Sequence, residues 1–219
     1  RGSWGQSFSS PLCVGKDRTL AFCESVWEEL FELFPYEYVH MGGDEVDKSN
    51  WKRCPDCQTR MRAEGLPDEA ALQAWFMHRM QRFCEARGRR MIGWDEILDG
   101  GLAPNATVMS WRGTEGGIAA ARMGHYAIMT PESHCYLDHY QDDPETQPLA
   151  FGACVPIGQT YSYDPAPDSL GSDICKYILG VQGNVWAEYL PTYEHAEYMI
   201  YPRIIALAEV GWTPMENKH

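Results

Sequence analysis

The sequence predicts an α/β fold in which helices cover a parallel β-sheet. Helical and strand patterns alternate along the 219 residues. The strand-like segments are short and apolar, as in strands that are buried on both faces. With 44% apolar residues, the chain can bury a sizeable core and fits one domain. No segment approaches the roughly 18 consecutive apolar residues that a membrane-spanning helix needs.

Apolar periodicity and end signals define each element in order. An apolar stripe with helical spacing starts at residue 17 and continues to Pro35, which ends that helix. Asp68 is the expected N-cap of the next helix and Gly88 its C-terminal stop. Pro202 should kink or split the last helix. The predicted strands are 36–41, 90–94, 107–111, 125–130 and 177–186, and the predicted helices are 17–34, 68–87, 114–123 and 192–209.

Carboxylates and aromatic side chains gather where the predicted strands end. In a (β/α)₈ barrel this edge is the active face. A doubly wound sheet would also bind ligands there, but it needs a glycine-rich turn that the sequence lacks. The irregular segment 131–176 is long enough to carry function. The residues at the strand ends are Asp44, Glu45, Trp94, Asp95, Glu96, Trp111, Tyr136, Asp138, Trp186 and Glu188.

An ordered series of short motifs starts with His40-Met41-Gly42-Gly43-Asp44-Glu45. It continues with Gly93-Trp94-Asp95-Glu96, Ser110-Trp111-Arg112-Gly113, Tyr136-Leu137-Asp138, Gly183 to Glu188, and Pro202-Arg203 to Trp212. The series resembles glycoside hydrolase family 20, the β-N-acetylhexosaminidases. The resemblance implies a (β/α)₈ TIM-barrel fold of which this chain carries about strands 4–8. We therefore expect residues 1–219 to be a partial catalytic barrel domain that lacks the N-terminal strands.

The resemblance also implies a retaining, substrate-assisted hydrolysis of terminal non-reducing N-acetylhexosamines, either N-acetylglucosamine or N-acetylgalactosamine. In this mechanism the substrate's own acetamido oxygen attacks the anomeric carbon and forms an oxazolinium ion. Glu45 matches the general acid, Asp44 matches the residue that binds the acetamido N–H, and Tyr136 matches the hydroxyl that holds the acetamido oxygen. The implied sugar-binding residues are Trp94, Trp111, Asp138, Trp186 and Glu188.

The geometry of a strand sets a condition on the carboxylate pair. Neighbouring residues of an extended strand point to opposite sides, so Asp44 and Glu45 cannot both reach one atom. A bend at Gly42-Gly43 would remove that restriction. Taken alone, the pair fits a helix N-terminus or a solvated turn better than a catalytic site, and only the ordered motifs reverse this reading.

A catalytically silent glycan-binding module on the same fold is the alternative function. Loss of Asp44, Glu45 or Tyr136 would have favoured it, and all three are present. Five strands of a barrel leave two unpaired edges, so we expect the chain alone to be weakly active or inactive. The same edges predict self-association.

Charge and cysteine content make other classes of function less favoured. The net charge of −13 argues against nucleic acid as a partner and suits a periplasmic or secreted protein. Of the eight cysteines, only Cys54 and Cys57 have metal-ligand spacing. A structural zinc site usually needs a second such pair, and only Cys84 follows. We therefore predict no metal and no cofactor, with free thiols or a local disulfide at this pair. A metal-binding or redox role of Cys54-Pro55-Asp56-Cys57 is a third, less favoured function, which stoichiometric zinc in the purified protein would support.

Overall fold

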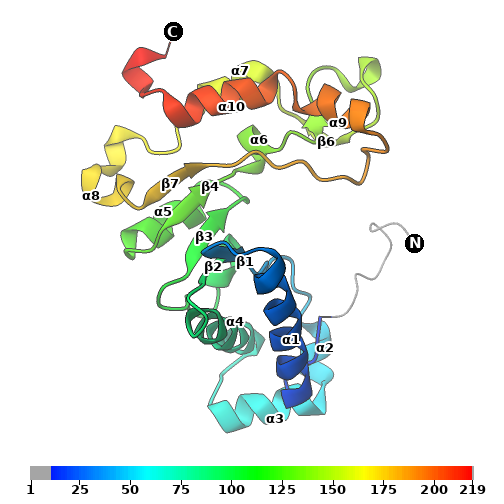
Figure 1. Ribbon diagram of the computed structural model, residues 1–219, viewed down its shortest axis with the longest axis vertical. Helices are drawn as coiled ribbons and strands as arrows, with labels where there is room; N and C mark the ends of the chain where they lie inside the picture. Colours follow the sequence, from blue (N-terminus) through cyan, green and yellow to red (C-terminus); the bar gives the residue numbers. More distant parts are fainter. Residues whose placement is uncertain (1–10, 219) are drawn as a thin grey trace. The chain divides into compact units, whose positions relative to one another are not determined.

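The computed structural model describes residues 11–218 (Figure 1). The chain divides into two compact units, residues 1–107 and 108–219, and each is described by itself. Across residues 11–218, no helix combines the length and apolarity needed to cross a membrane.

The first unit packs helices against a pair of parallel strands. β1 pairs with β2 in parallel, with Val39 opposite Met91. α4 begins where the Asp68 carboxylate accepts the Ala71 N–H at 2.8 Å, as the sequence predicted. The elements are α1 (Asp17–Leu33), β1 (Tyr38–His40), α2 (Ser49–Arg53), α3 (Pro55–Glu64), α4 (Glu69–Glu85), β2 (Arg90–Trp94) and the 3₁₀ helix η1 (Asp95–Leu98).

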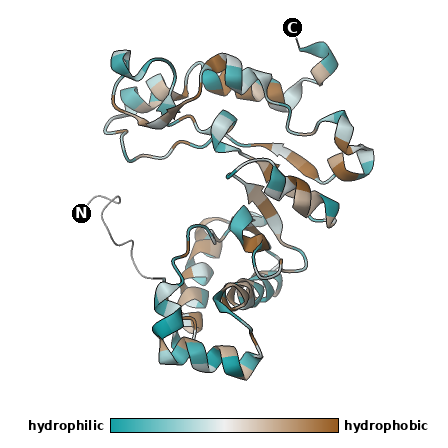
Figure 2. Ribbon diagram, turned by 180° about the vertical axis from the view of Figure 1, so that it is seen from behind, coloured by the Kyte–Doolittle hydropathy of each residue, from teal (hydrophilic) through white to brown (hydrophobic). Residues whose placement is uncertain are grey.

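Two apolar clusters hold the first unit together. Phe31 of α1 packs with Met80 and Phe83 of α4, and two ion pairs, Arg79–Glu24 and Arg87–Glu28, join the same helices. Figure 2 shows brown apolar segments on helices of the first unit. The second cluster joins the segment before α1 to α2, α3 and α4. Its buried members are Val14, Trp51, Cys57, Met61 and Leu72.

The second unit also contains parallel strands with helices. β3, β4 and β7 pair in that order, with Val108 opposite Ala127 and Met129 opposite Val181. Met129, Leu207 and Val210 belong to its main core. The elements are β3 (Thr107–Ser110), α5 (Glu115–Arg122), β4 (Ala127–Met129), α6 (Glu132–Cys135), β5 (His139–Tyr140), η2 (Pro144–Thr146), β6 (Phe151–Cys154), α7 (Ile157–Ser162), η3 (Asp168–Leu170), α8 (Ser172–Cys175), β7 (Ile178–Val181), α9 (Tyr193–Ile200), α10 (Arg203–Trp212) and η4 (Met215–Asn217).

All five predicted strands are present, but some boundaries differ. β7 ends at Val181 rather than at residue 186, because the backbone after it pairs with a different segment, at Tyr136–Asn184. Segment 131–176, predicted to be irregular, contains short helices and the β5–β6 ladder. The last predicted helix is split at Pro202 into α9 and α10, as expected.

Arg203, at the start of α10, is a fully buried cation in the second unit. Its guanidinium donates to the carbonyl oxygens of Leu137 at 2.7 Å, Val155 at 3.0 Å and Met199 at 2.7 Å. Burial lowers the pKa of Arg203 to about 10, so the side chain remains charged at neutral pH. This one side chain therefore fixes α10 to the loop that contains Leu137.

Replacing Arg203 with Met should destabilise the protein strongly. The change leaves three buried carbonyls without their donor, and each costs about 1–3 kcal/mol. We expect a loss of at least about 3 kcal/mol in the free energy of unfolding, measured by chemical denaturation. Lys at this position should recover only part, since it lacks the planar fork. The control Arg122→Met changes an exposed arginine of α5, and equal unfolding midpoints for the two variants would contradict the prediction.

Candidate active site

The segment after β1 carries Asp44 and Glu45 on a sharply bent backbone. Gly42 and Gly43 have φ values of 72° and 101°, and Glu45 has φ 47°, in the left-handed region that non-glycine residues seldom adopt. A Cβ atom at Gly43 would lie 2.7 Å from Cγ2 of Ile97, so glycine is needed there for close packing as well. The bend at Gly42-Gly43 is present, and because β1 ends at His40, the alternation of a strand does not apply to Asp44 and Glu45.

A third carboxylate, that of Glu96, raises the pKa values of Asp44 and Glu45 further. Burial of the carboxyl group raises the pKa of Asp44, and the charge of Glu96 adds to the shift. Burial also raises the pKa of Glu45, followed by the charges of Asp44 and Glu96. Glu96 lies in η1, directly after β2. Glu96 is one of the residues predicted to lie at a strand end, but it is not one of the predicted site residues. Like charges close together favour a protonated member.

His40 and Trp94 support the bent segment from the two strands. Their ring centroids are 4.6 Å apart. The Gly42 N–H donates to Nδ1 of His40 at 3.1 Å, and the Trp94 N–H donates to the Gly42 carbonyl at 3.0 Å. Burial lowers the pKa of His40 to about 4, so the imidazole is neutral at physiological pH. These contacts fix the backbone immediately before Asp44.

The second unit holds Tyr136 next to Trp111. Their rings are 6.3 Å apart at an interplanar angle of 25°. Burial raises the pKa of Tyr136, and hydrogen bonding from Asn184 and Trp186 partly opposes the shift. The hydroxyl is therefore protonated at neutral pH and available as a donor.

Asn184 joins two distant segments of this unit. Its N–H donates to the Cys135 carbonyl at 2.9 Å, and its own carbonyl accepts the Leu137 N–H at 2.7 Å. These bonds hold Tyr136 beside the segment that carries Trp186 and Glu188. Asn184 and Arg203 both belong to motifs that carried the resemblance, but neither was predicted to have an individual role. A buried asparagine or arginine is found only once its backbone partners are known.

Asp138 is a buried acceptor with unused capacity. It is 4% exposed, and its Oδ1 has no hydrogen-bond partner among the described residues. Burial raises the pKa of Asp138 to about 6; the charge of Glu188 adds to the shift and that of Arg203 opposes it. Glu188 itself is exposed, and Trp186 is 44% exposed. A buried carboxylate oxygen without a donor is suited to receive one from a ligand.

The predicted site residues thus fall into two groups, each with its own internal contacts. Asp44, Glu45 and Trp94 belong to the first unit. The second unit holds Trp111, Tyr136, Asp138, Trp186 and Glu188.

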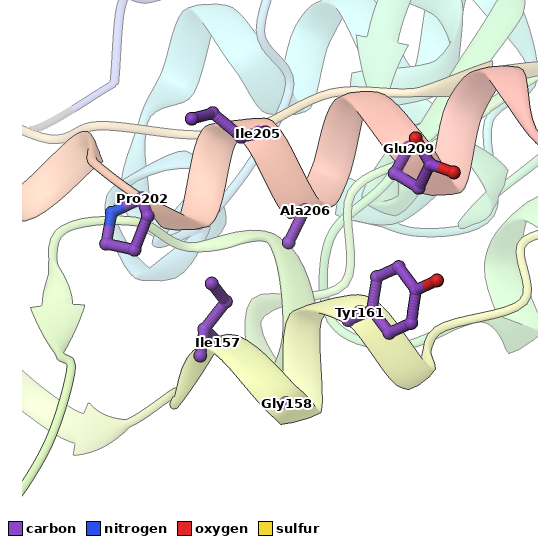
Figure 3. A pocket seen from close by; sticks show the side chains of 7 residues that line it. All are labelled: Ile157, Gly158, Tyr161, Pro202, Ile205, Ala206 and Glu209. Carbon is purple, nitrogen blue, oxygen red and sulfur yellow. The ribbon is translucent and has the colours of Figure 1, made fainter. Parts of the chain in front are cut away.

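A mainly apolar hollow lies elsewhere in the second unit (Figure 3). It is formed by α7 and α10, with Ile157, Tyr161, Ile205 and Glu209 among its lining residues. None of the predicted site residues lines it. The hollow therefore does not mark the candidate active site.

Comparison with known proteins gives consistent matches over nearly the whole chain. Residues 1–215 match the model of the glycosyl hydrolase family 20 catalytic domain. The chain is 53% identical over 216 residues to a β-hexosaminidase of Porphyromonas gingivalis, covering 98% of this chain and 28% of that protein. It is 35% identical over 205 residues to a β-hexosaminidase of Vibrio furnissii, covering 92% of this chain and 33% of that protein.

Solved structures agree with these matches. The exo-β-N-acetylglucosaminidase of Vibrio harveyi, in complex with N-acetylglucosamine, superposes with a TM-score of 0.86 at 31% identity, covering 95% of this chain and 33% of that one. A β-N-acetylhexosaminidase of Streptomyces coelicolor gives a TM-score of 0.79 at 28% identity, covering 98% of this chain and 41% of that one.

The chain spans about a third of the length of the relatives it matches. Its α/β fold corresponds to part of the TIM barrel of these enzymes, as the sequence predicted. The match of residues 1–215 to the family's catalytic domain shows that this chain belongs to glycosyl hydrolase family 20.

Proposed function

We propose that this chain is part of a β-N-acetylhexosaminidase that removes terminal non-reducing N-acetylhexosamine residues from glycans. The observation that carries the proposal is the bent segment from Gly42 to Glu45. It presents two adjacent carboxyl groups whose pKa values are both raised. Hydrolysis of a glycosidic bond needs a carboxyl group that still holds a proton near neutral pH. Membership of the family supports the substrate class.

Glu45 is the general acid in this proposal. It protonates the leaving oxygen and then, as a carboxylate, accepts a proton from the attacking water. Asp44 accepts the acetamido N–H and balances the positive charge that develops on the sugar. The substrate's acetamido oxygen is the nucleophile, so neither carboxylate forms a covalent bond to the sugar. Holding an internal nucleophile in line for attack contributes through proximity, by about 7–11 kcal/mol at best.

The second group of residues binds the sugar in this proposal. The protonated hydroxyl of Tyr136 donates to the acetamido oxygen, and its stacking with Trp111 supports that orientation. The faces of Trp94, Trp111 and Trp186 cover the apolar faces of the pyranose ring and its acetyl methyl group. Asp138 and Glu188 accept hydroxyl protons of the sugar. An acceptor left empty is costly, so these carboxylates reject ligands that lack the matching hydroxyl.

Replacing Glu45 with Gln in the enzyme that contains this chain should remove general acid catalysis. We expect kcat to fall on the order of 10²–10⁴-fold. KM should change little, since Gln keeps the shape of the side chain. Turnover of a chromogenic N-acetylglucosaminide measures both. The control Glu197→Gln changes an exposed carboxylate of α9 and should leave kcat unchanged. A wild-type protein that binds the sugar without turnover would instead favour a silent glycan-binding module.

Replacing Asp44 with Asn should shift the alkaline limb of the pH–activity profile. After burial, the negative charge of Asp44 is the next cause of the raised pKa of Glu45. Without that charge the pKa of Glu45 falls. Because the acid must hold its proton, activity is then lost at a lower pH than in the wild type. The pH dependence of kcat/KM measures the limb, and carboxyl NMR titration of Glu45 gives the same pKa without activity. An unchanged limb, or one at higher pH, contradicts the prediction.

The isolated chain of residues 1–219 should show little or no turnover of the same substrate. Among the described residues β1 pairs with β2 and β7 with β4, and each leaves unpaired backbone groups on its other side. We expect self-association through these edges, visible by size-exclusion chromatography. Turnover comparable to that of a full-length family enzyme would contradict the prediction of inactivity, and a well-behaved monomer would contradict that of self-association.

A further inference from the structure

Three cysteine sulfurs of the first unit meet outside the candidate active site. Sγ of Cys13 lies 3.4 Å from Sγ of Cys54 and 3.7 Å from Sγ of Cys57. All three sulfurs lie within 4.8 Å of one another. By the usual spacing of structural zinc sites, further ligands are expected downstream of the Cys54–Cys57 pair. The structure places one upstream instead, in the segment before α1.

The sulfur separations fit ligands that share a metal ion. With a zinc–sulfur bond of about 2.3 Å, two sulfurs at corners of a tetrahedron are about 3.8 Å apart. A disulfide requires about 2.05 Å. A disulfide would also join only two of the three thiols, whereas a metal ion accounts for all three at once.

The backbone around the sulfurs is arranged to stabilise negative charge. Cys54 is the residue before α3, with Pro55 at the first helical position. The backbone N–H groups of Cys57 and Asp56 hydrogen-bond to the Cys54 sulfur. The backbone of Gly15 provides a corresponding hydrogen bond to Cys57. Thiolates rather than thiols are the form that binds metals.

Gly15 makes this arrangement possible. A Cβ atom there would lie 2.2 Å from the backbone carbon of Asp56 and 2.4 Å from the backbone nitrogen of Cys57. The segment after Cys13 therefore approaches the turn between Cys54 and Cys57 as closely as two backbones can. This contact brings the third sulfur to the pair.

The surroundings suit a structural metal rather than an exposed redox pair. Cys57 is fully buried and packs in the cluster with Val14 and Trp51. The Trp51 indole N–H donates to the Leu12 carbonyl at 3.0 Å, which closes the same segment onto α2.

We propose that Cys13, Cys54 and Cys57 bind one zinc ion as three thiolates. Zinc fits because soft thiolate ligands select it among the common divalent ions. The ion would fasten the segment before α1 to α2 and α3, which directly follow Asp44 and Glu45. The role is structural, and it does not rest on the proposed hydrolase activity.

Metal analysis of the protein purified under reducing conditions and supplied with zinc tests the proposal. We expect about one zinc ion per chain after dialysis. Cys13→Ser and Cys54→Ser should each lose most of it, while Cys154→Ser, which changes an exposed cysteine outside the cluster, should keep it. Reconstitution with Co²⁺ should give a thiolate-to-metal charge-transfer band that the first two variants lack. A wild-type protein without bound zinc, or a Cys13→Ser variant with undiminished zinc, overturns the proposal.

A second measurement needs no variant and therefore covers a failure to fold. Alkylation of the wild-type protein followed by mass spectrometry should find Cys13, Cys54 and Cys57 protected when zinc is present and labelled after a chelator removes it. Cys154 should be labelled in both cases. Equal labelling of the three cysteines with and without zinc overturns the proposal. So does a disulfide between two of them together with the absence of zinc in the reduced protein.

Discussion

Parallel pairing of the strands decides where the candidate residues lie. In parallel strands all carboxyl ends face the same edge, so the residues that follow each strand gather there. In the first unit this rule places Asp44 after β1 and Glu96 after β2, and their charges interact. In the second unit Trp111 follows β3 and stacks on Tyr136. The backbone bend after β1 and the buried hydrogen bonds of the second unit then fix individual residues within this arrangement.

The two units fix their site residues by different means. The first uses backbone geometry, with two glycines in left-handed conformations and the neutral His40 beneath them. The second uses hydrogen bonds between distant segments, since the buried Arg203 side chain donates to the Leu137 carbonyl and the backbone carbonyl of Asn184 accepts the Leu137 N–H. The buried guanidinium of Arg203 is costly to remove, because the carbonyls that it satisfies would be left without their donor. The first strategy is local in sequence and the second is not.

This difference explains what the sequence could predict. Strand positions, the Asp68 cap and the split at Pro202 follow from local patterns, and the structure has them. The short helices α2 and α3 were not predicted, because α3 buries only Cys57 and Met61 and shows no apolar stripe. The end of β7 was predicted too late, since its partner changes at Asn184. The sulfurs of Cys13 and Cys54 lie close together although 41 residues separate them in the sequence. No rule of cysteine spacing predicts a contact over that separation. Contacts between distant segments account for most of what the sequence left undetermined.

The left-handed conformation of Glu45 has a consequence for how the protein tolerates change. With φ at 47°, the backbone of Glu45 lies in a region that glycine occupies without penalty but other residues seldom adopt. Glycine at position 45 would thus relieve strain and favour the folded state while removing the carboxyl group. Stability and activity pull in opposite directions at this residue, so selection for thermal robustness alone would tend to discard the side chain on which the proposed chemistry depends.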